Sequence, residues 1–187
     1  MLPDLVKCSG CEMEYLFPRG AFEYVLNFAQ ASLTVEDDDL LSMPLAPVWC
    51  STCRGPSYAE NLQAASSWGD LRAQLRAGVS IEYPFDSSFC SPAIAEELLN
   101  RYHRVLSGRF APGRCVSCGG VQHMRIDAAL KHEGCDGFLT PHVLVASVNY
   151  QPNAYRLYDR SGAMIGRLLS RSEDEQRWLI ERCTYGE

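Results

Sequence analysis

The chain of 187 residues has no apolar run near the roughly 20 residues that a membrane-spanning helix needs, so we expect no membrane partner. Its first seven residues lack both a basic stretch and a long apolar stretch, and they do not predict a secretory signal. Basic residues are outnumbered, 17 against 23 acidic ones, and the net charge of −6 disfavours a general nucleic-acid-binding protein. We therefore expect a cytoplasmic protein.

Familiar catalytic motifs are also missing. The sequence contains no GxSxG, GxxxxGK or HExxH, and Arg114 stands where the zinc deaminases have a proline before the CxxC cysteine. One candidate nucleophile is Cys90, which directly precedes a predicted helix start, with His103 a helix away. A small buried side chain is the more common role of such a cysteine. We expect no enzyme, and a Cys/His enzyme using Cys90 is the alternative.

Cysteine, by contrast, is abundant. There are nine cysteines, so a fully paired disulfide framework is impossible, and six of them form three CxxC pairs. In a reducing compartment such pairs are typical of metal knuckles or redox sites. None opens a helix in a βαβ frame, as a thioredoxin-like site would require. The pairs therefore predict metal binding by Cys8/Cys11, Cys50/Cys53 and Cys115/Cys118.

Two zinc sites follow from this pattern, because two CxxC knuckles supply the four thiolates of a tetrahedral ion. Read in chain order, the first two knuckles form the front site: Cys8, Cys11, Cys50 and Cys53. The third knuckle and an HxxC knuckle form the back site: Cys115, Cys118, His132 and Cys135. Both sites are closed by four protein ligands, so we expect structural rather than catalytic Zn²⁺.

The fourth ligand of the back site could be any of three histidines. His132 repeats the two-residue knuckle spacing before Cys135, whereas His123 lies in a predicted strand and His142 at the start of another. Knuckle spacing brings two ligands onto one ion, so we expect His132 to be the ligand.

The elements predict an α+β fold with two zinc-ribbon-like modules, a helical middle, a small antiparallel sheet and a C-terminal helix. Helices are expected at 57–65, 67–78 and 91–107, and a capping box at 172–175 opens the last one. Residues 21–31 have a helical spacing of apolar side chains but also a composition rich in strand-forming residues, which leaves a strand open there. The organisation is then an acidic zinc-knuckle module at 1–66, a helical segment at 67–112 and a back module at 113–187 that holds a zinc ribbon, antiparallel strands and the terminal helix.

Charge is concentrated in the front module, where residues 1–60 hold 3 basic and 9 acidic side chains. Four consecutive acids make its centre, and we expect them to bind a basic protein partner, although a solvated loop is the common alternative. They are Glu36, Asp37, Asp38 and Asp39. One arginine-rich stretch could instead bind nucleic acid or pair with this acidic module: Arg101, Arg104, Arg109 and Arg114.

The knuckle sequences resemble known bacterial proteins. RCVSCGG at 114–120, followed by HEGCDG at 132–137, resembles bacterial zinc-ribbon modules, and WCSTC at 49–53 is similar to knuckles in small bacterial proteins. Some proteins of this kind are similar to immunity proteins that neutralise polymorphic toxins. The resemblance implies a zinc-stabilised inhibitor of a basic toxin. The alternative is a zinc-ribbon nucleic-acid-binding or transcription accessory factor.

Overall fold

The computed structural model contains three β-sheets and two α-helices within its described residues. In the part of the chain that the structure describes, no helix is both long and apolar enough to span a membrane. The described residues are 2–27, 34–62, 67–81, 83, 91–107, 109, 112–126, 130–143, 155–171 and 177–182.

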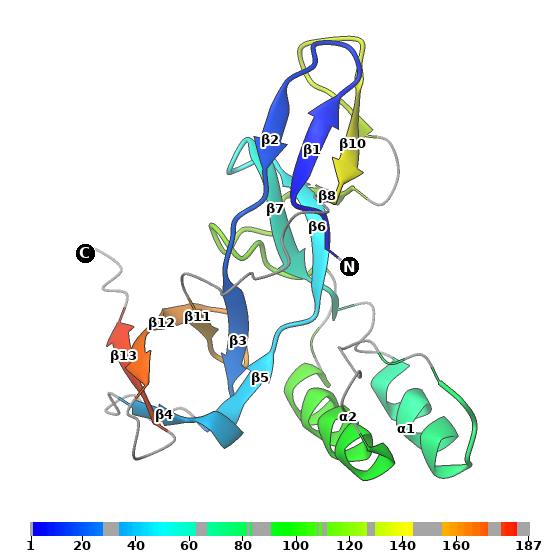
Figure 1. Cartoon of the computed structure of the whole chain (residues 1–187), viewed down its shortest axis with the longest axis vertical. Helices are drawn as coiled ribbons and strands as arrows, with labels where there is room; N and C mark the ends of the chain where they lie inside the picture. The colour runs from blue at the N-terminus through cyan, green and yellow to red at the C-terminus, as the bar shows by residue number, and fades with distance from the viewer. Residues whose placement is uncertain are drawn as a thin grey trace.

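The first sheet is built by the strands beside the first and last knuckles. They are β1 (Leu5–Cys8), β2 (Glu14–Leu16), β9 (Leu130–Lys131) and β10 (Phe138–His142), in the order β2-β1-β10-β9. All neighbours are antiparallel, and β1 pairs directly with β10. We call this sheet with its two knuckles the outer ribbon, and it forms the top of the molecule in Figure 1.

The second sheet repeats this plan with the two middle knuckles. β6 (Leu45–Cys50) pairs antiparallel with β7 (Gly55–Glu60) on one side and with β8 (His123–Arg125) on the other. We call this sheet with its knuckles the inner ribbon. Its chain segments lie between those of the outer ribbon in the sequence, so one ribbon is nested inside the other.

The third sheet has six strands in the order β4-β13-β12-β11-β3-β5. Only β3 and β11 are parallel; the other neighbours are antiparallel. The strands are β3 (Ala21–Val25), β4 (Thr34–Glu36), β5 (Leu40–Ser42), β11 (Tyr155–Tyr158), β12 (Met164–Arg171) and β13 (Arg177–Arg182).

The two edges of this sheet are consecutive in the chain. β4 and β5 are joined by the 3-10 turn η1 (Asp37–Asp39), so a single kinked segment pairs with β13 at its start and with β3 at its end. The sheet therefore curls into a small barrel, visible at the lower left of Figure 1. The acidic run forms the corner that closes it. A separate hydrophobic cluster lies inside: Val25, Val35, Leu157, Leu168 and Ile180.

The helices α1 (Trp68–Arg76) and α2 (Pro92–Leu106) confirm the predicted helical middle. Ser91 caps α2, because its hydroxyl accepts from the backbone N–H of Ile94, the third residue of the helix. Gly78 ends α1 with φ +73, and paired hydrogen bonds from its own N–H and the next one complete a Schellman motif.

α2 also covers the free edge of β5. The Tyr102 hydroxyl donates to the Ser42 carbonyl at 2.8 Å, and the Arg101 guanidinium donates to the Leu40 carbonyl at 2.7 Å. These bonds satisfy edge carbonyls that would otherwise be open to another strand.

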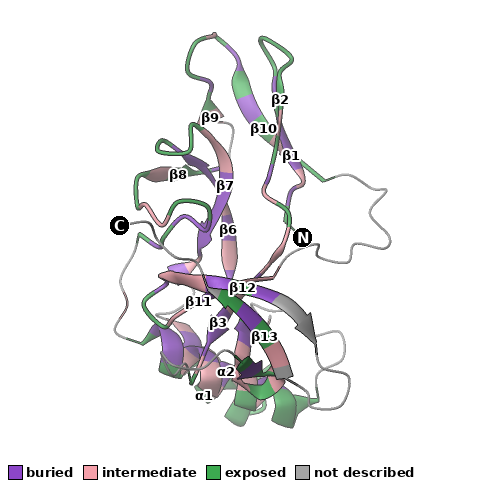
Figure 2. Cartoon of the chain, turned by 90° about the vertical axis from the view of Figure 1, so that its left-hand side faces the viewer, coloured by how far each residue is buried: buried purple, intermediate pink, exposed green. Residues whose placement is uncertain are grey.

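A single main core joins the ribbons, the barrel and the helices. Phe17 of the outer ribbon stacks on Tyr58 of the inner ribbon with ring centroids 4.9 Å apart, and Phe22 of the barrel packs edge-on against the same Tyr58 ring. Trp68 stacks on Tyr102 between the two helices at 4.5 Å. Figure 2 shows buried residues running through both the ribbons and the barrel.

Three segments with helix signals are strands. Residues 21–25 form β3, a central strand in which Phe22 and Tyr24 face the main core while Glu23 faces the other way. Residues 55–60 form β7, where all of 57–60 are buried. Phe22, Tyr24 and Val25 pack well on a sheet, and β3 is paired on both sides. β7 is paired with β6 over six positions and forms a further bridge from Ala59 to Cys115.

The expected C-terminal helix, the third of these segments, is wrong. Residues 177–182 form β13, which lies between β12 and β4. Ile180 is buried while Leu179 is exposed, the alternation of a strand. The capping box at 172–175 and Cys183 lie outside the described residues.

The segment boundaries expected at 66 and 112 enclose both helices. The front and back segments, however, share all three sheets, since β1 pairs with β10, β6 with β8, and β3 with β11. The hydrogen bonds of every sheet therefore connect residues before 67 with residues after 112.

Candidate metal centres

The eight predicted ligands gather in two clusters of four, and their grouping is nested. The outer cluster combines the first and last knuckles, Cys8, Cys11, His132 and Cys135. The inner cluster combines the two middle knuckles, Cys50, Cys53, Cys115 and Cys118. Within each cluster all four ligand atoms lie within 4.8 Å of one another, so each can hold a metal ion.

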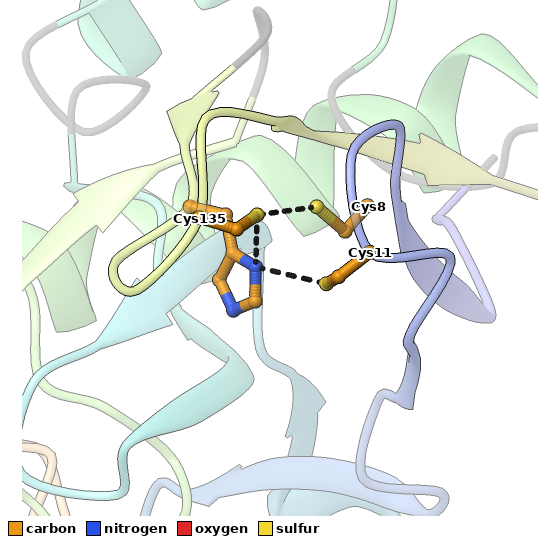
Figure 3. Close-up of side chains that lie close together, drawn as sticks. Cys8, Cys11 and Cys135 are labelled. Carbon is orange, nitrogen blue, oxygen red and sulfur yellow. Dashed lines mark hydrogen bonds between the residues drawn. The ribbon is translucent and has the colours of Figure 1, made fainter.

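Strand pairing brings the outer knuckles together. Cys8 is the last residue of β1 and Cys11 follows the strand, while His132 and Cys135 lie between β9 and β10, and β1 pairs with β10. The Cys8 and Cys135 sulfurs are 3.3 Å apart, and His132 Nδ1 lies 3.3 Å from the Cys135 sulfur and 3.5 Å from the Cys11 sulfur. Figure 3 shows the labelled cysteines converging from the two loops.

The inner cluster has the same construction on β6 and β8. Cys50 and Cys118 have sulfurs 3.6 Å apart, and the sulfurs of Cys53 and Cys115 are 3.9 Å apart. Each pair joins two knuckles far apart in the sequence. Cys50 and Cys115 are buried, whereas Cys53 and Cys118 lie at the surface.

These separations fit a tetrahedral ion. Metal–sulfur bonds of about 2.3 Å and metal–nitrogen bonds of about 2.0 Å place tetrahedral ligands about 3.8 Å apart for two sulfurs and about 3.5 Å apart for sulfur and nitrogen. A disulfide requires about 2.05 Å, and all the described cysteines are free. The Cys8 thiol releases its proton readily, because the backbone N–H groups of Cys11 and Gly10 lower its pKa to about 6 against an opposing effect of burial, whereas burial raises the pKa of the Cys53 thiol.

His132 is held by contacts behind the cluster. Its Nε2 lies 3.0 Å from the Tyr15 hydroxyl, and that hydroxyl donates to the Met13 sulfur at 3.6 Å. When Nδ1 binds a metal, Nε2 carries the ring proton and donates to Tyr15. Burial raises the pKa of Tyr15, with the nearby thiolates acting in the same direction, so the phenol stays protonated. Trp49 of the inner ribbon packs edge-on against both rings.

Backbone geometry closes the knuckles. The N–H groups of Gly10 and Gly137 donate to the sulfurs of Cys8 and Cys135, and the two glycines lie against each other. A Cβ on Gly137 would lie 2.3 Å from the Gly10 nitrogen and 2.6 Å from the Cys8 sulfur. In three knuckles the residue after the second cysteine has positive φ: Glu12, Arg54 and Gly119.

The structure therefore corrects the chain-order pairing of the knuckles. Cys8 and Cys11 do not share a cluster with Cys50 and Cys53; each pair instead joins a knuckle from the back of the chain. The spacing within a knuckle is local, whereas pairing between knuckles depends on which strands are neighbours. No spacing in the sequence carried that information.

His132 is the histidine that joins a cluster, as expected, but its cluster, the outer one, contains Cys8 and Cys11 in place of the predicted Cys115 and Cys118. His123 lies on β8, where its Nε2 is 2.7 Å from the Gly113 carbonyl oxygen, and it belongs to neither cluster. His142 is exposed at the end of β10. The proposed nucleophile Cys90 lies outside the described residues.

The acidic run is a hydrogen-bonded corner rather than the expected loop. The Asp37 carboxylate accepts from the Trp178 indole N–H, and the Asp39 carboxylate accepts from the Asn27 side chain at 2.6 Å. Glu36 and Asp38 are exposed. The corner thus presents carboxylates from a fixed backbone.

Two residues of the arginine stretch bind inside the protein. Arg101 donates to the carbonyls of Asp38 and Leu40. Arg109 forms a bidentate pair with the buried Glu60 at 2.6 and 2.7 Å. Arg104, by contrast, is exposed beside Glu97 at 3.4 Å. Arg101 and Arg109 therefore have structural roles that the sequence did not separate from a binding surface.

Glu60 joins the ribbons to the barrel. Besides Arg109 it accepts from the Tyr24 hydroxyl at 2.7 Å and from the Arg114 backbone N–H at 2.8 Å. Arg109 also donates to the Ser161 carbonyl in the β11–β12 turn at 2.9 Å. Although burial opposes it, the bonds to Glu60 raise the pKa of Arg109, so the guanidinium keeps its charge.

Comparison of the chain with protein-family models, with curated proteins and with solved structures found no match in any of the three. Functional conclusions therefore depend on the geometry of the clusters, the barrel corner and the surrounding charges.

Proposed function

We propose that this protein is a non-catalytic, two-zinc protein that binds a basic protein partner through Glu36, Asp37, Asp38 and Asp39. The observation that carries the proposal is the placement of this acidic run at the corner of the barrel, between two strands that are each paired to the sheet. Carboxylates fixed on a hydrogen-bonded frame lose less conformational entropy on binding than those of a free loop, and they speed association with a cationic surface.

Zinc is the ion that the clusters fit best. The outer cluster offers three thiolates and one imidazole and the inner cluster four thiolates, and both are typical zinc ligand sets. Four protein ligands leave no position for a reacting water. Apparent binding free energies of such sites are on the order of 10 kcal/mol. Free thiolates also require a reducing environment, which supports a cytoplasmic location.

Within this class, the specific candidate is an inhibitor, such as a bacterial immunity protein that neutralises a basic toxin. A focused acidic surface on a metal-stabilised frame suits one-to-one neutralisation of a cationic protein, because like-charged competitors are repelled.

The test is to capture partners from the native host and measure association with the purified partner. Changing the four acids to their amides should slow association, and the difference should shrink at high salt because the screening length falls from about 10 Å at 0.1 M to about 3 Å at 1 M. Metal content and melting temperature of the variant should stay unchanged. A dominant basic partner that binds the variant equally well would contradict the proposal.

The nucleic-acid alternative has weaker support from the described arginines. Arg101 and Arg109 are bonded within the protein, so their substitution would disturb the fold as well as any external contact. Arg104→Ala is the cleaner variant, since its side chain is exposed. Co-purification of RNA or DNA that Arg104→Ala and salt both reduce would favour this alternative.

A further inference from the structure

A groove of about 1140 Å³ opens beside the acidic corner, between the barrel and α2. Half of its lining is aliphatic, Tyr155 of β11 and Trp178 of β13 add partly buried aromatic rings, and the buried Tyr102 of α2 also lines it. Glu23 of β3 and Asp37 of the corner add two carboxylates. None of the described residues that line the groove is basic.

The geometry points to a cation-binding groove: we propose that it receives a lysine or arginine side chain of the basic protein partner. The inference rests on the proposed function and names the site at which that partner is anchored. Aromatic faces and carboxylates together bind an ammonium or guanidinium group through cation–π and charge-assisted contacts.

The aromatic wall is held in place before any partner arrives. The rings of Tyr155 and Trp178 lie with centroids 5.3 Å apart, and the Trp178 indole N–H donates to Asp37. Tyr102 is fixed by its bond to the Ser42 carbonyl. Side chains already fixed in this way lose little further freedom on binding.

Glu23 is the groove carboxylate whose ionised form a bound cation would stabilise. Its carboxylate accepts from the Ser42 hydroxyl at 3.0 Å, and burial raises its pKa to about 7. The charge of Arg101 opposes this rise, but the Arg101 guanidinium is bonded to backbone carbonyls of the corner. A partner cation in the groove would stabilise the ionised carboxylate directly.

The test uses two probes: a short synthetic peptide rich in lysine, and the same peptide with every lysine acetylated. Trp178 fluorescence should respond to the first probe and not to the second, because acetylation removes the charge. Glu23→Gln should weaken binding by about tenfold or more, as expected for a contact to a charged group. Glu14→Gln, an exposed carboxylate on β2, should leave it unchanged.

Zero-length carbodiimide cross-linking provides a second readout that does not depend on affinity. It should join a peptide lysine to Glu23 or Asp37, as mapped by mass spectrometry. Tyr155→Leu keeps an apolar side chain and removes the aromatic face, so it should also weaken binding if cation–π contacts contribute. Metal content and melting temperature show whether each variant is folded.

A variant with amides at Glu36, Asp38 and Asp39 but with Asp37 kept separates the groove from the corner. If this variant loses the peptide while Glu23→Gln and Tyr155→Leu bind normally, the groove inference is overturned and the proposed function stands. If none of the three variants alters binding of the peptide, the groove inference and the proposed function are both overturned. Binding of a single-stranded oligonucleotide in place of the peptide, with loss in Arg104→Ala, also overturns both.

Discussion

At the scale of single residues, Glu23 shows how position changes a side chain's chemistry. It lies on a strand whose neighbours Phe22 and Tyr24 face the main core, while its own carboxylate faces the groove with one hydroxyl donor. An exposed glutamate would titrate well below neutral pH. Burial raises the pKa of Glu23 to about 7, so its charge depends on pH in the physiological range.

The raised pKa of Glu23 makes the stability of the fold depend on pH. The folded state holds the Glu23 proton more tightly than the unfolded chain does, so this group stabilises the fold at low pH and loses that contribution as pH rises from about 4.5 to about 7. Glu23→Gln should therefore gain stability relative to the wild type as pH rises, by up to about 3 kcal/mol. Denaturant unfolding at pH 6 and pH 8, with metal saturating, measures the difference. A constant difference across this range would contradict the raised pKa.

At the scale of elements, the knuckle is a local unit that the sequence specifies well. Two residues between ligands, backbone N–H donors to sulfur and a residue with positive φ recur in the knuckles. One knuckle supplies only two of the four ligands of a cluster, and the other two come from a knuckle elsewhere in the chain. In the outer ribbon the two knuckles meet at Gly10 and Gly137.

That contact predicts a specific loss on adding one methyl group. Gly137→Ala should force the two knuckles apart, because backbone atoms and the Cys8 sulfur occupy the position of the new Cβ. One equivalent of metal should be lost while the inner cluster keeps its own. Gly55→Ala is the matched control, since nothing lies within 4 Å of its added Cβ. Elemental analysis of both variants decides the matter, and two retained equivalents in Gly137→Ala would rule out the close contact.

At the scale of the whole molecule, nesting means that each metal cluster joins a knuckle from the first third of the chain to a knuckle beyond residue 112. Cys11 and His132 of one cluster are 121 positions apart, and Cys53 and Cys115 of the other are 62 apart. A metal ion in each cluster therefore closes a long loop, which restricts the unfolded chain. Trp49 packs against His132 and joins the two ribbons.

Paired cysteine substitutions distinguish nested from chain-order grouping. Cys11→Ser with Cys135→Ser should remove one zinc equivalent, because both residues belong to the outer cluster. Cys11→Ser with Cys53→Ser should remove both equivalents, because each cluster loses a ligand. Chain-order grouping requires the opposite results. Native mass spectrometry of protein never exposed to chelator counts the ions.

The junction of ribbon and barrel depends on the buried ion pair of Glu60 and Arg109. Arg109→Ala leaves a carboxylate whose side chain is 1% exposed without its cation, and should cost about 3–5 kcal/mol of unfolding free energy. Arg104→Ala removes an exposed pair with Glu97 and should cost less than about 1 kcal/mol. Chemical denaturation compares the two. Equal effects would mean that Glu60 is not buried in solution.

The sequence by itself determined the ligands, the knuckles and the helical middle, because these depend on contacts between residues a few positions apart. Ser91 and Gly78 mark helix ends through their own backbone bonds, and His132 was identified by its spacing to Cys135. The tertiary structure alone decided that β3, β7 and β13 are strands: β3 pairs with the distant β11 and β13 with the distant β4, while β7 pairs with β6 across a knuckle. It also decided the nested clusters and the acidic corner. Both depend on pairing between strands that lie far apart in the chain, such as β1 with β10 and β13 with β4, and local spacing does not encode that pairing.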